Sequence, residues 1–107
     1  MGVPRMTIPT QRVLRVMLSD SREHYGLEIG QAAGLASGTV HPILARLEAL
    51  GWVESEWEDM DPRSEGRPQR RYYRLTAHGK VASREALARA YRPVNTRSIR
   101  TPATEGM

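Results

Sequence analysis

The sequence predicts a mainly α-helical domain that carries one small β-hairpin. Apolar residues recur every three or four positions through the first half of the chain, which is the period of an amphipathic helix. After Gly51 the period changes to two, and a segment that contains Gly and Pro separates two alternating stretches, which is typical of a hairpin. A chain of 107 residues has room for one compact domain.

The composition excludes some kinds of site and favours one kind of partner. The chain has no cysteine, which excludes disulfides and thiolate metal sites and fits a reducing, cytoplasmic location. No apolar run approaches the ~20 residues of a membrane span, so we expect no membrane partner. The net charge is +4, but residues 1–60 carry 5 arginines against 8 acids, whereas residues 61–107 carry 11 basic residues against 4 acids. A basic half of this kind favours a polyanionic partner.

The N-terminal segment leads into a first helix. We expect residues 1–9 to form a flexible arm, because Pro4 and Pro9 oppose regular structure. Thr10 is then the predicted N-cap of a helix that runs from Gln11 to about Leu18. Apolar pairs spaced four apart form its buried stripe.

Two further helices follow a polar connection over residues 19–24. The second is short and runs from about Leu27 to Ala33, with Leu27 on its buried face. Gly34 marks a tight turn, since glycine adopts positive φ without steric cost. We expect Ser37 to cap a third helix that ends near Leu50. Its apolar residues keep the helical period closely: Val40, Ile43, Leu44, Leu47 and Leu50.

The hairpin comes next. Residues 53–57 alternate apolar and acidic side chains, as in a strand with one wet face. Residues 59–68 contain two prolines and a glycine and are predicted to be a loop. Residues 70–75 alternate again and give the second strand, so the two strands and their loop form the hairpin.

A last helix and a tail complete the prediction. Thr76 is the expected cap of a helix that reaches about Arg92, with Val81 and Tyr91 among the few large residues of its apolar stripe. Residues 93–107 are predicted to be a disordered tail. The order helix, short helix, tight turn, longer helix, hairpin, helix is that of a winged helix-turn-helix domain, which we assign to residues 10–92.

Several separated segments resemble one family, the PadR-like transcriptional regulators. They are residues 25–29 (YGLEI), 37–48 (SGTVHPILARLE), 54–58 (ESEWE) and 70–76 (RRYYRLT), followed by Gly79. The resemblance extends from about Pro9 to Tyr91. It implies a homodimer held largely by helices outside the DNA-reading unit, here the helix after Thr76 together with the first helix. It also implies DNA contacts from the third helix and from the hairpin, which is called the wing.

The expected DNA contacts lie on two elements. A helix N-terminus favours a phosphate, and guanidinium groups bind phosphates and suit narrow minor grooves. Each residue also has a purely structural interpretation: Ser37 caps its helix, the arginines are solvated, and Arg46 pairs with an acid. His41 stands where the family more often has tyrosine. The predicted site residues are Ser37, Thr39, His41 and Arg46 on the third helix, and Arg63, Arg67, Arg70 and Arg71 on the wing.

The leading hypothesis is a sequence-specific, DNA-binding transcriptional regulator: a homodimeric repressor that binds double-stranded DNA at a palindromic operator. The acidic strand supports an alternative, a protein-interaction module that does not bind DNA. A third hypothesis adds a small aromatic effector held at the dimer interface by Trp52 and Trp57, although core and strand packing explains both tryptophans as well. The histidines lack ligand spacing, and no nucleophile turn or phosphate loop is present, so we expect no enzyme activity, cofactor or metal.

Overall fold

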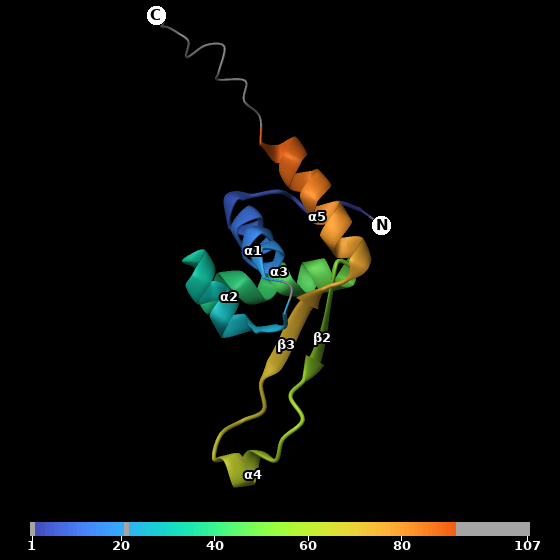
Figure 1. Cartoon of the computed structure of the whole chain (residues 1–107). Helices are drawn as coiled ribbons and strands as arrows, with labels where there is room; N and C mark the ends of the chain where they lie inside the picture. The colour runs from blue at the N-terminus through green and yellow to red at the C-terminus, as the bar shows by residue number, and fades with distance from the viewer. Residues whose placement is uncertain (1, 21, 92–107) are drawn as a thin grey trace, which may run out of the picture.

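The computed structural model describes residues 2–20 and 22–91. Over these residues the elements are α1 (Ile8–Ser19), β1 (His24–Tyr25), α2 (Gly26–Ala33), α3 (Ser37–Ala49), β2 (Val53–Trp57), α4 (Pro62–Glu65), β3 (Arg71–Leu75) and α5 (Ala77–Ala90). The longer helices gather at one end of the molecule, and the hairpin of β2 and β3 projects from them with α4 at its tip (Figure 1). The predicted fold class, mainly helical with a small antiparallel hairpin, is confirmed. In the described part, no helix is long and apolar enough to cross a membrane.

The sheet has three antiparallel strands in the order β1-β3-β2. Val53 lies opposite Leu75 and Trp57 opposite Arg71, which confirms the predicted pairing of β2 with β3. The other edge of β3 pairs with β1, where His24 lies opposite Tyr73. The sequence predicts only a polar connection over residues 19–24 and does not predict the strand β1. A strand of two residues has no period to read, and only its pairing with β3 defines it.

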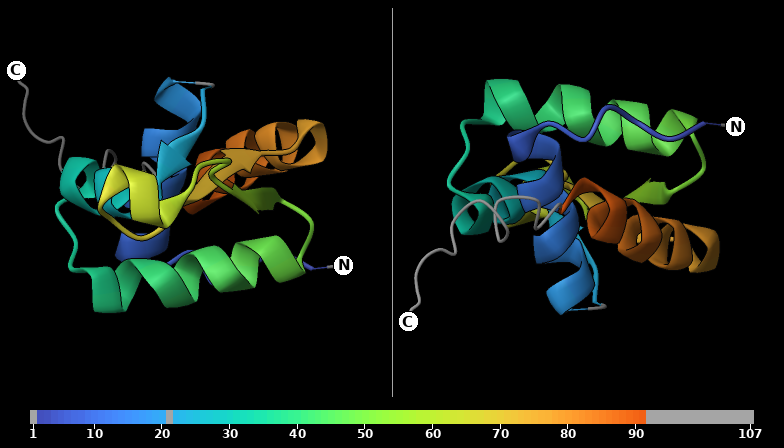
Figure 2. Two further views of the ribbon diagram at one scale, coloured as in Figure 1. Left: turned by 90° about the horizontal axis from the view of Figure 1, so that it is seen from below. Right: turned by 90° about the horizontal axis from the view of Figure 1, so that it is seen from above.

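One core lies between the helices and the sheet. Helix α1 packs against α2, α3 and α5, while α3 runs along one side of the molecule and α5 lies along the other (Figure 2). The predicted stripe of α3 is buried, except that Leu50 is only half-buried. The largest fully buried side chains include Trp52, Leu14, Ile29, Leu44 and Leu47.

The first helix begins earlier than predicted. Its N-cap is Thr7, whose hydroxyl accepts a hydrogen bond from the backbone N–H of Thr10 at 3.3 Å. Thr10 lies within the helix and is buried, so its assignment as the cap is wrong. Pro9 falls in the first helical turn, where the missing N–H of proline costs nothing, and α1 therefore starts at Ile8.

The third helix begins without a side-chain cap. Its N-cap is Ala36, and Ser37 is the first helical residue, so the prediction that Ser37 caps this helix is wrong. Pro42 lies inside the helix, and the helix ends at Ala49. Gly51 then adopts φ 79°, a left-handed conformation that favours glycine and turns the chain into β2.

Three large apolar side chains that we expected in the core are exposed. Leu27 is 65% exposed, Val81 55% and Tyr91 67%. Helices α2 and α5 face the core with other residues. The side of α2 that contains Gly30 lies against Leu35 and Val40, and the side of α5 that contains Gly79 lies against Trp52. The predicted loop over residues 59–68 contains the single-turn helix α4. The predicted tail, residues 93–107, lies outside the described residues.

Candidate DNA-binding surface

Helix α3 turns one face to solvent along its whole length. Its buried residues are Val40, Ile43, Leu44 and Leu47. At 100° per residue, the positions opposite that face are Gly38, Pro42, Ala45 and Ala49, and all four are exposed. None of these side chains carries a hydrogen-bonding group. The centre of the exposed face is therefore small and apolar, and polar side chains flank it.

The four predicted residues of α3 are all exposed, but they lie on different flanks. Thr39 and Arg46 are seven residues apart and project from the same side of the helix. His41 is two residues from Thr39, which turns it to the opposite flank, toward β3. Ser37 is at the N-terminal end, where the first backbone N–H groups of the helix have no intrahelical partner. The structure thus brings His41 close to the wing and keeps Thr39 and Arg46 apart from it.

Arg67 of the wing has an internal partner. Its two terminal nitrogens donate to the two carboxylate oxygens of Glu58 at 2.7 and 3.0 Å. The Arg67 guanidinium, helped by the backbone N–H of Arg70, lowers the pKa of Glu58 to about 2. Across the loop between β2 and β3, the side-chain amide of Gln69 also donates to the backbone carbonyl of Glu58 at 3.0 Å. This arginine therefore orders the base of the wing loop.

Arg71 also has internal partners, and these connect the wing to α3. Its Nε donates to the hydroxyl of Ser55 at 2.9 Å, and that hydroxyl donates to Glu48 of α3 at 2.7 Å. The guanidinium also lies over the ring of Trp57, 5.1 Å from its centre. Because these contacts join β2, β3 and α3, they set the position of the wing relative to the helix.

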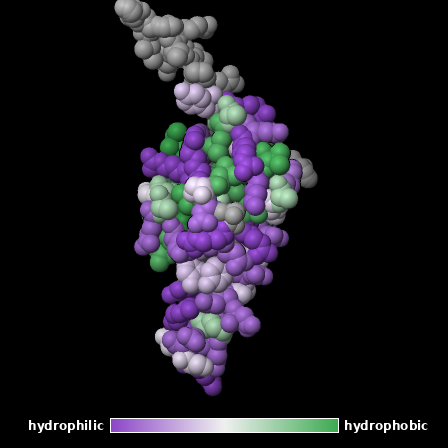
Figure 3. Space-filling model, in the orientation of Figure 1, coloured by the Kyte–Doolittle hydropathy of each residue, from purple (hydrophilic) through white to green (hydrophobic). Residues whose placement is uncertain are grey.

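Arg70 and Arg63 are the exposed arginines of the wing. The Arg70 guanidinium lies over the ring of Tyr25, 4.4 Å from its centre, and Tyr25 stacks on Tyr72 at 4.5 Å. Arg63 lies on α4 at the tip, and among the described residues its guanidinium has no hydrogen-bond or ion-pair partner. The projecting hairpin is hydrophilic along most of its length (Figure 3).

The acidic side chains of β2 are partly neutralised. Arg74 pairs with Glu54 at 2.9 Å and with Glu56 at 3.6 Å, and it also pairs with Glu23. Three carboxylates share this one guanidinium, so the face retains negative charge.

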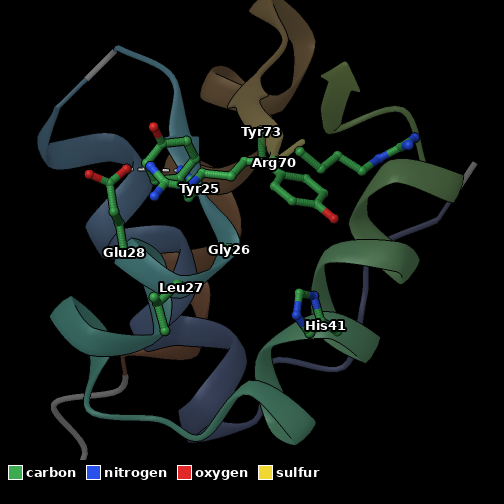
Figure 4. A pocket seen from close by; sticks show the side chains of 8 residues that line it. Tyr25, Gly26, Leu27, Glu28, His41, Arg70 and Tyr73 are labelled. Carbon is green, nitrogen blue, oxygen red and sulfur yellow. Dashed lines mark hydrogen bonds between the residues drawn. The ribbon is translucent and has the colours of Figure 1, made fainter. Parts of the chain in front are cut away.

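A cavity of about 410 Å³ lies between the start of α2, α3 and β3 (Figure 4). His41 and Tyr73 point into the same open space. Gly26 borders it, and a Cβ at this position would come within 3.0 Å of the His41 ring. The cavity joins three predicted site residues, namely His41, Arg70 and Arg71. The sequence did not indicate it, because Tyr25 and Tyr73 are far apart in the chain and meet only through the β1–β3 pairing.

The sequence of residues 13–85 matches the transcriptional regulator PadR-like family. The chain belongs to this family. The resemblance of its wing and third helix to PadR-like proteins is thereby confirmed, and at the level of sequence no curated protein matches the chain.

Solved structures of transcriptional regulators share the fold of this PadR-like protein. The PcaV transcriptional regulator from Streptomyces coelicolor has a TM-score of 0.69 and 23% identity over 86% of this chain and 62% of that chain. A MepR mutant from S. aureus has a TM-score of 0.65 and 17% identity over 92% and 67%. AbfR, overoxidised and bound to DNA, has a TM-score of 0.61 and 28% identity over 88% and 65%. This PadR-like chain thus covers only about two thirds of the length of its neighbours.

Proposed function

We propose that this PadR-like protein is a cytoplasmic, sequence-specific regulator of transcription, a repressor that binds double-stranded DNA as a homodimer at a palindromic operator. One observation carries the proposal: the outer face of α3 is exposed along the helix and lies next to a projecting hairpin that carries exposed arginines. A long exposed helix beside a projecting hairpin has the shape to lie in a major groove, and the exposed arginines of the hairpin supply positive charge for the phosphates. That AbfR has been crystallised bound to DNA supports the proposal.

The small residues of α3 favour a close approach to the base edges. Gly38, Pro42 and Ala45 let the helix backbone come near the groove floor, and the methyl group of Ala45 suits a thymine methyl. The flanking side chains supply polar contacts. Arg46 has the length and fork to contact guanine or a phosphate, and Thr39 and His41 lie nearer the N-terminal end of the helix.

On the wing we assign the DNA contacts first to Arg70 and Arg63, which are exposed. Arg67 and Arg71 can contact phosphate only by giving up hydrogen bonds to Glu58 and Ser55. Arg67 and Arg71 therefore mainly hold the wing in place. We expect them to make fewer phosphate contacts than Arg70 and Arg63.

The dimer is assigned to α5 together with α1. Val81 on α5 and Tyr91, which directly follows this helix, are large, apolar and exposed. Ile8 is 61% exposed on α1, which packs against α5. Burying these side chains against a second copy would remove apolar surface from water. A two-fold dimer places its half-sites about one helical turn, roughly 10 bp, apart.

The salt dependence of DNA binding tests the wing. Each phosphate that an arginine neutralises contributes about 0.9 to the slope of log K against log salt concentration. A dimer carries two copies of each residue, so Arg70→Ala should lower the slope by about 1.8 and weaken binding to every sequence similarly. Arg5→Ala, which removes an exposed arginine that precedes α1, is the matched control. An unchanged slope for Arg70→Ala would contradict the proposed wing contact.

The acidic face around Arg74 favours one alternative, a protein-interaction module. It carries the carboxylates of Glu23, Glu54 and Glu56, which DNA would repel. The two functions differ in a mobility-shift assay on random and genomic duplexes at low salt. Binding with the slope described above supports the regulator, whereas no binding to any duplex would favour the interaction module.

A further inference from the structure

Arg70, an exposed arginine of the wing, is held at both ends of its side chain. Its backbone N–H donates to the carboxylate of Glu58 at 3.2 Å, and its carbonyl accepts from the backbone N–H of Glu58 at 2.8 Å. At the other end, the guanidinium lies over the ring of Tyr25, 4.4 Å from its centre, and Figure 4 shows the side chain extending across this ring. A long side chain that is fixed at both ends has lost much of its rotational freedom.

The ring of Tyr25 is itself held firmly. Tyr25 pairs with Tyr72 between β1 and β3, and the two rings stack with their centres 4.5 Å apart. The Tyr72 hydroxyl donates to the Tyr25 hydroxyl at 2.9 Å, and the backbone N–H of Tyr25 donates to the carboxylate of Glu28 at 2.9 Å. The hydrogen bond from Tyr72, with a smaller effect of the Arg70 guanidinium, lowers the pKa of Tyr25. Backbone and side-chain contacts together therefore fix this ring at the start of α2.

The contact with Tyr25 leaves the Arg70 guanidinium able to bind a phosphate. The N–H donors of a guanidinium point outward in its plane, whereas stacking on a ring uses its face. A phosphate can therefore meet the edge of the group while its face stays on the ring. Among the described residues no carboxylate forms an ion pair with Arg70, in contrast to Arg67 and Arg74.

The other exposed arginine of the wing has no such support. Arg63 lies on α4 at the tip, and in the described part of the chain its guanidinium stacks on no ring. Its side chain must be ordered at the moment it binds a phosphate, and this ordering costs free energy. The Arg70 side chain is ordered before DNA arrives.

We infer that Tyr25 is a positioning residue, which acts through Arg70 by holding its guanidinium in place for a phosphate of the DNA. The inference rests on the proposed function. Because Tyr25 lies at the start of α2, it fixes the phosphate contact of the wing relative to the helix-turn-helix unit. Tyr25 and Arg70 are far apart in the sequence and meet only through the pairing of β1 with β3.

A double-mutant cycle tests this role, with fluorescence anisotropy and a duplex selected from a random pool. Tyr25→Leu keeps apolar bulk and removes the aromatic face. Losing a contact that orders one side chain should weaken binding about threefold per chain, and about tenfold for a dimer on two half-sites. In the Arg70→Ala background the same substitution should change the affinity by less than about twofold, because no guanidinium remains to be held.

Two controls separate positioning from a general effect on the fold. Arg63→Ala removes the other exposed arginine of the wing, so in this background Tyr25→Leu should still weaken binding about tenfold. Tyr25→Phe keeps the ring and loses only the hydroxyl, and it should bind within about twofold of the wild type. If Tyr25→Leu weakens binding equally in the wild type and in the Arg70→Ala background, Tyr25 does not act through Arg70 and the inference is wrong.

Nuclear magnetic resonance measures the same contact without DNA. Protons held over the face of an aromatic ring resonate upfield, so the side-chain signals of Arg70 should lie upfield in the wild type and in Tyr25→Phe. Tyr25→Leu should remove this shift. Signals that Tyr25→Leu leaves unchanged would overturn the inference whether or not the protein binds DNA. If the shift is present but no duplex binds, the proposed function fails and the role of Tyr25 in DNA binding fails with it, while the contact between Tyr25 and Arg70 stands.

Discussion

Replacing Gly79 by alanine tests the packing of α5 on the core. A Cβ at Gly79 would lie 1.9 Å from the carbonyl oxygen of Trp52 and 2.7 Å from its carbonyl carbon. Both atoms belong to the backbone, so no side-chain rotation relieves the overlap. Ordinary contact begins at 3.4 Å, and α5 must therefore retreat by roughly 1.5 Å.

The retreat would loosen the buried face of α5. Ala86 and Leu87 are 2% and 8% exposed, and both belong to the core cluster that contains Trp52. Overpacking of this kind costs about 1–3 kcal/mol, and a backbone clash belongs at the upper end. The higher helix propensity of alanine returns up to about 1 kcal/mol. We therefore expect Gly79→Ala to lower the free energy of unfolding by about 2 kcal/mol.

Urea unfolding followed by tryptophan fluorescence and by circular dichroism measures this change. Gly38→Ala is the matched control, because a Cβ at Gly38 in α3 meets nothing within 4 Å. The control should raise the free energy of unfolding by about 0.5–1 kcal/mol, the usual gain for this exchange in a helix. If Gly79→Ala were as stable as the wild type, or if both variants lost stability equally, the described contact between α5 and Trp52 would be wrong.

Two further predictions concern single polar groups. Ser83 is fully buried on α5, and its hydroxyl has no hydrogen-bond partner among the described residues. Ser83→Ala should therefore raise the free energy of unfolding by about 1 kcal/mol in the same urea assay. A loss of stability would mean that the hydroxyl has a hydrogen-bond partner. The pKa of Glu58 is lowered from 4.5 to about 2, so the stability from its pairing with Arg67 is present above pH 4.5 and is lost as the pH falls toward 2. Glu58→Gln should flatten the fall of the urea midpoint over this range, and an equally steep fall would count against the pair.

The sequence predicted those parts of the fold that have a local period. The buried residues of α3 repeat every three or four positions, and Val53–Trp57 alternates, so helix, strand and hairpin were all visible. Thr76 was also a correct cap: its hydroxyl accepts from the backbone N–H of Gly79 at 2.8 Å. Local chemistry decides each of these features.

The features that were missed depend on contacts between distant residues. Nothing in His24–Tyr25 indicates a strand until β3 lies beside it. Leu27 has the right spacing for a core residue, but α2 packs through Gly30, where a Cβ would come within 3.0 Å of the Leu35 carbonyl oxygen, and this turns Leu27 to solvent. Spacing gives the period of a helix and leaves open which of its apolar residues meets the core.

The candidate residues lie on the helix and the hairpin that the sequence predicts, but the sequence does not indicate which partners their side chains contact. Recognising the hairpin in the sequence is enough to assign Arg63, Arg67, Arg70 and Arg71 to the wing. Which of them are exposed depends on the strand register, because Glu58 meets Arg67 across the loop and Ser55 lies beside Arg71. The same register positions the wing against α3 through Glu48. Charge counting over the sequence could not separate exposed arginines from those that hold the wing in place.

The claim that α3 contacts DNA is tested most directly by a negative charge at the centre of its exposed face. Ala45→Glu should leave the fold intact, because Ala45 is exposed and glutamate is a good helix former. Ala77→Glu adds the same charge at the exposed start of α5, away from this face. Fluorescence anisotropy with a selected duplex should show binding about a hundredfold weaker for Ala45→Glu and nearly unchanged for Ala77→Glu. Equal affinity of Ala45→Glu and the wild type would mean that α3 does not face the DNA.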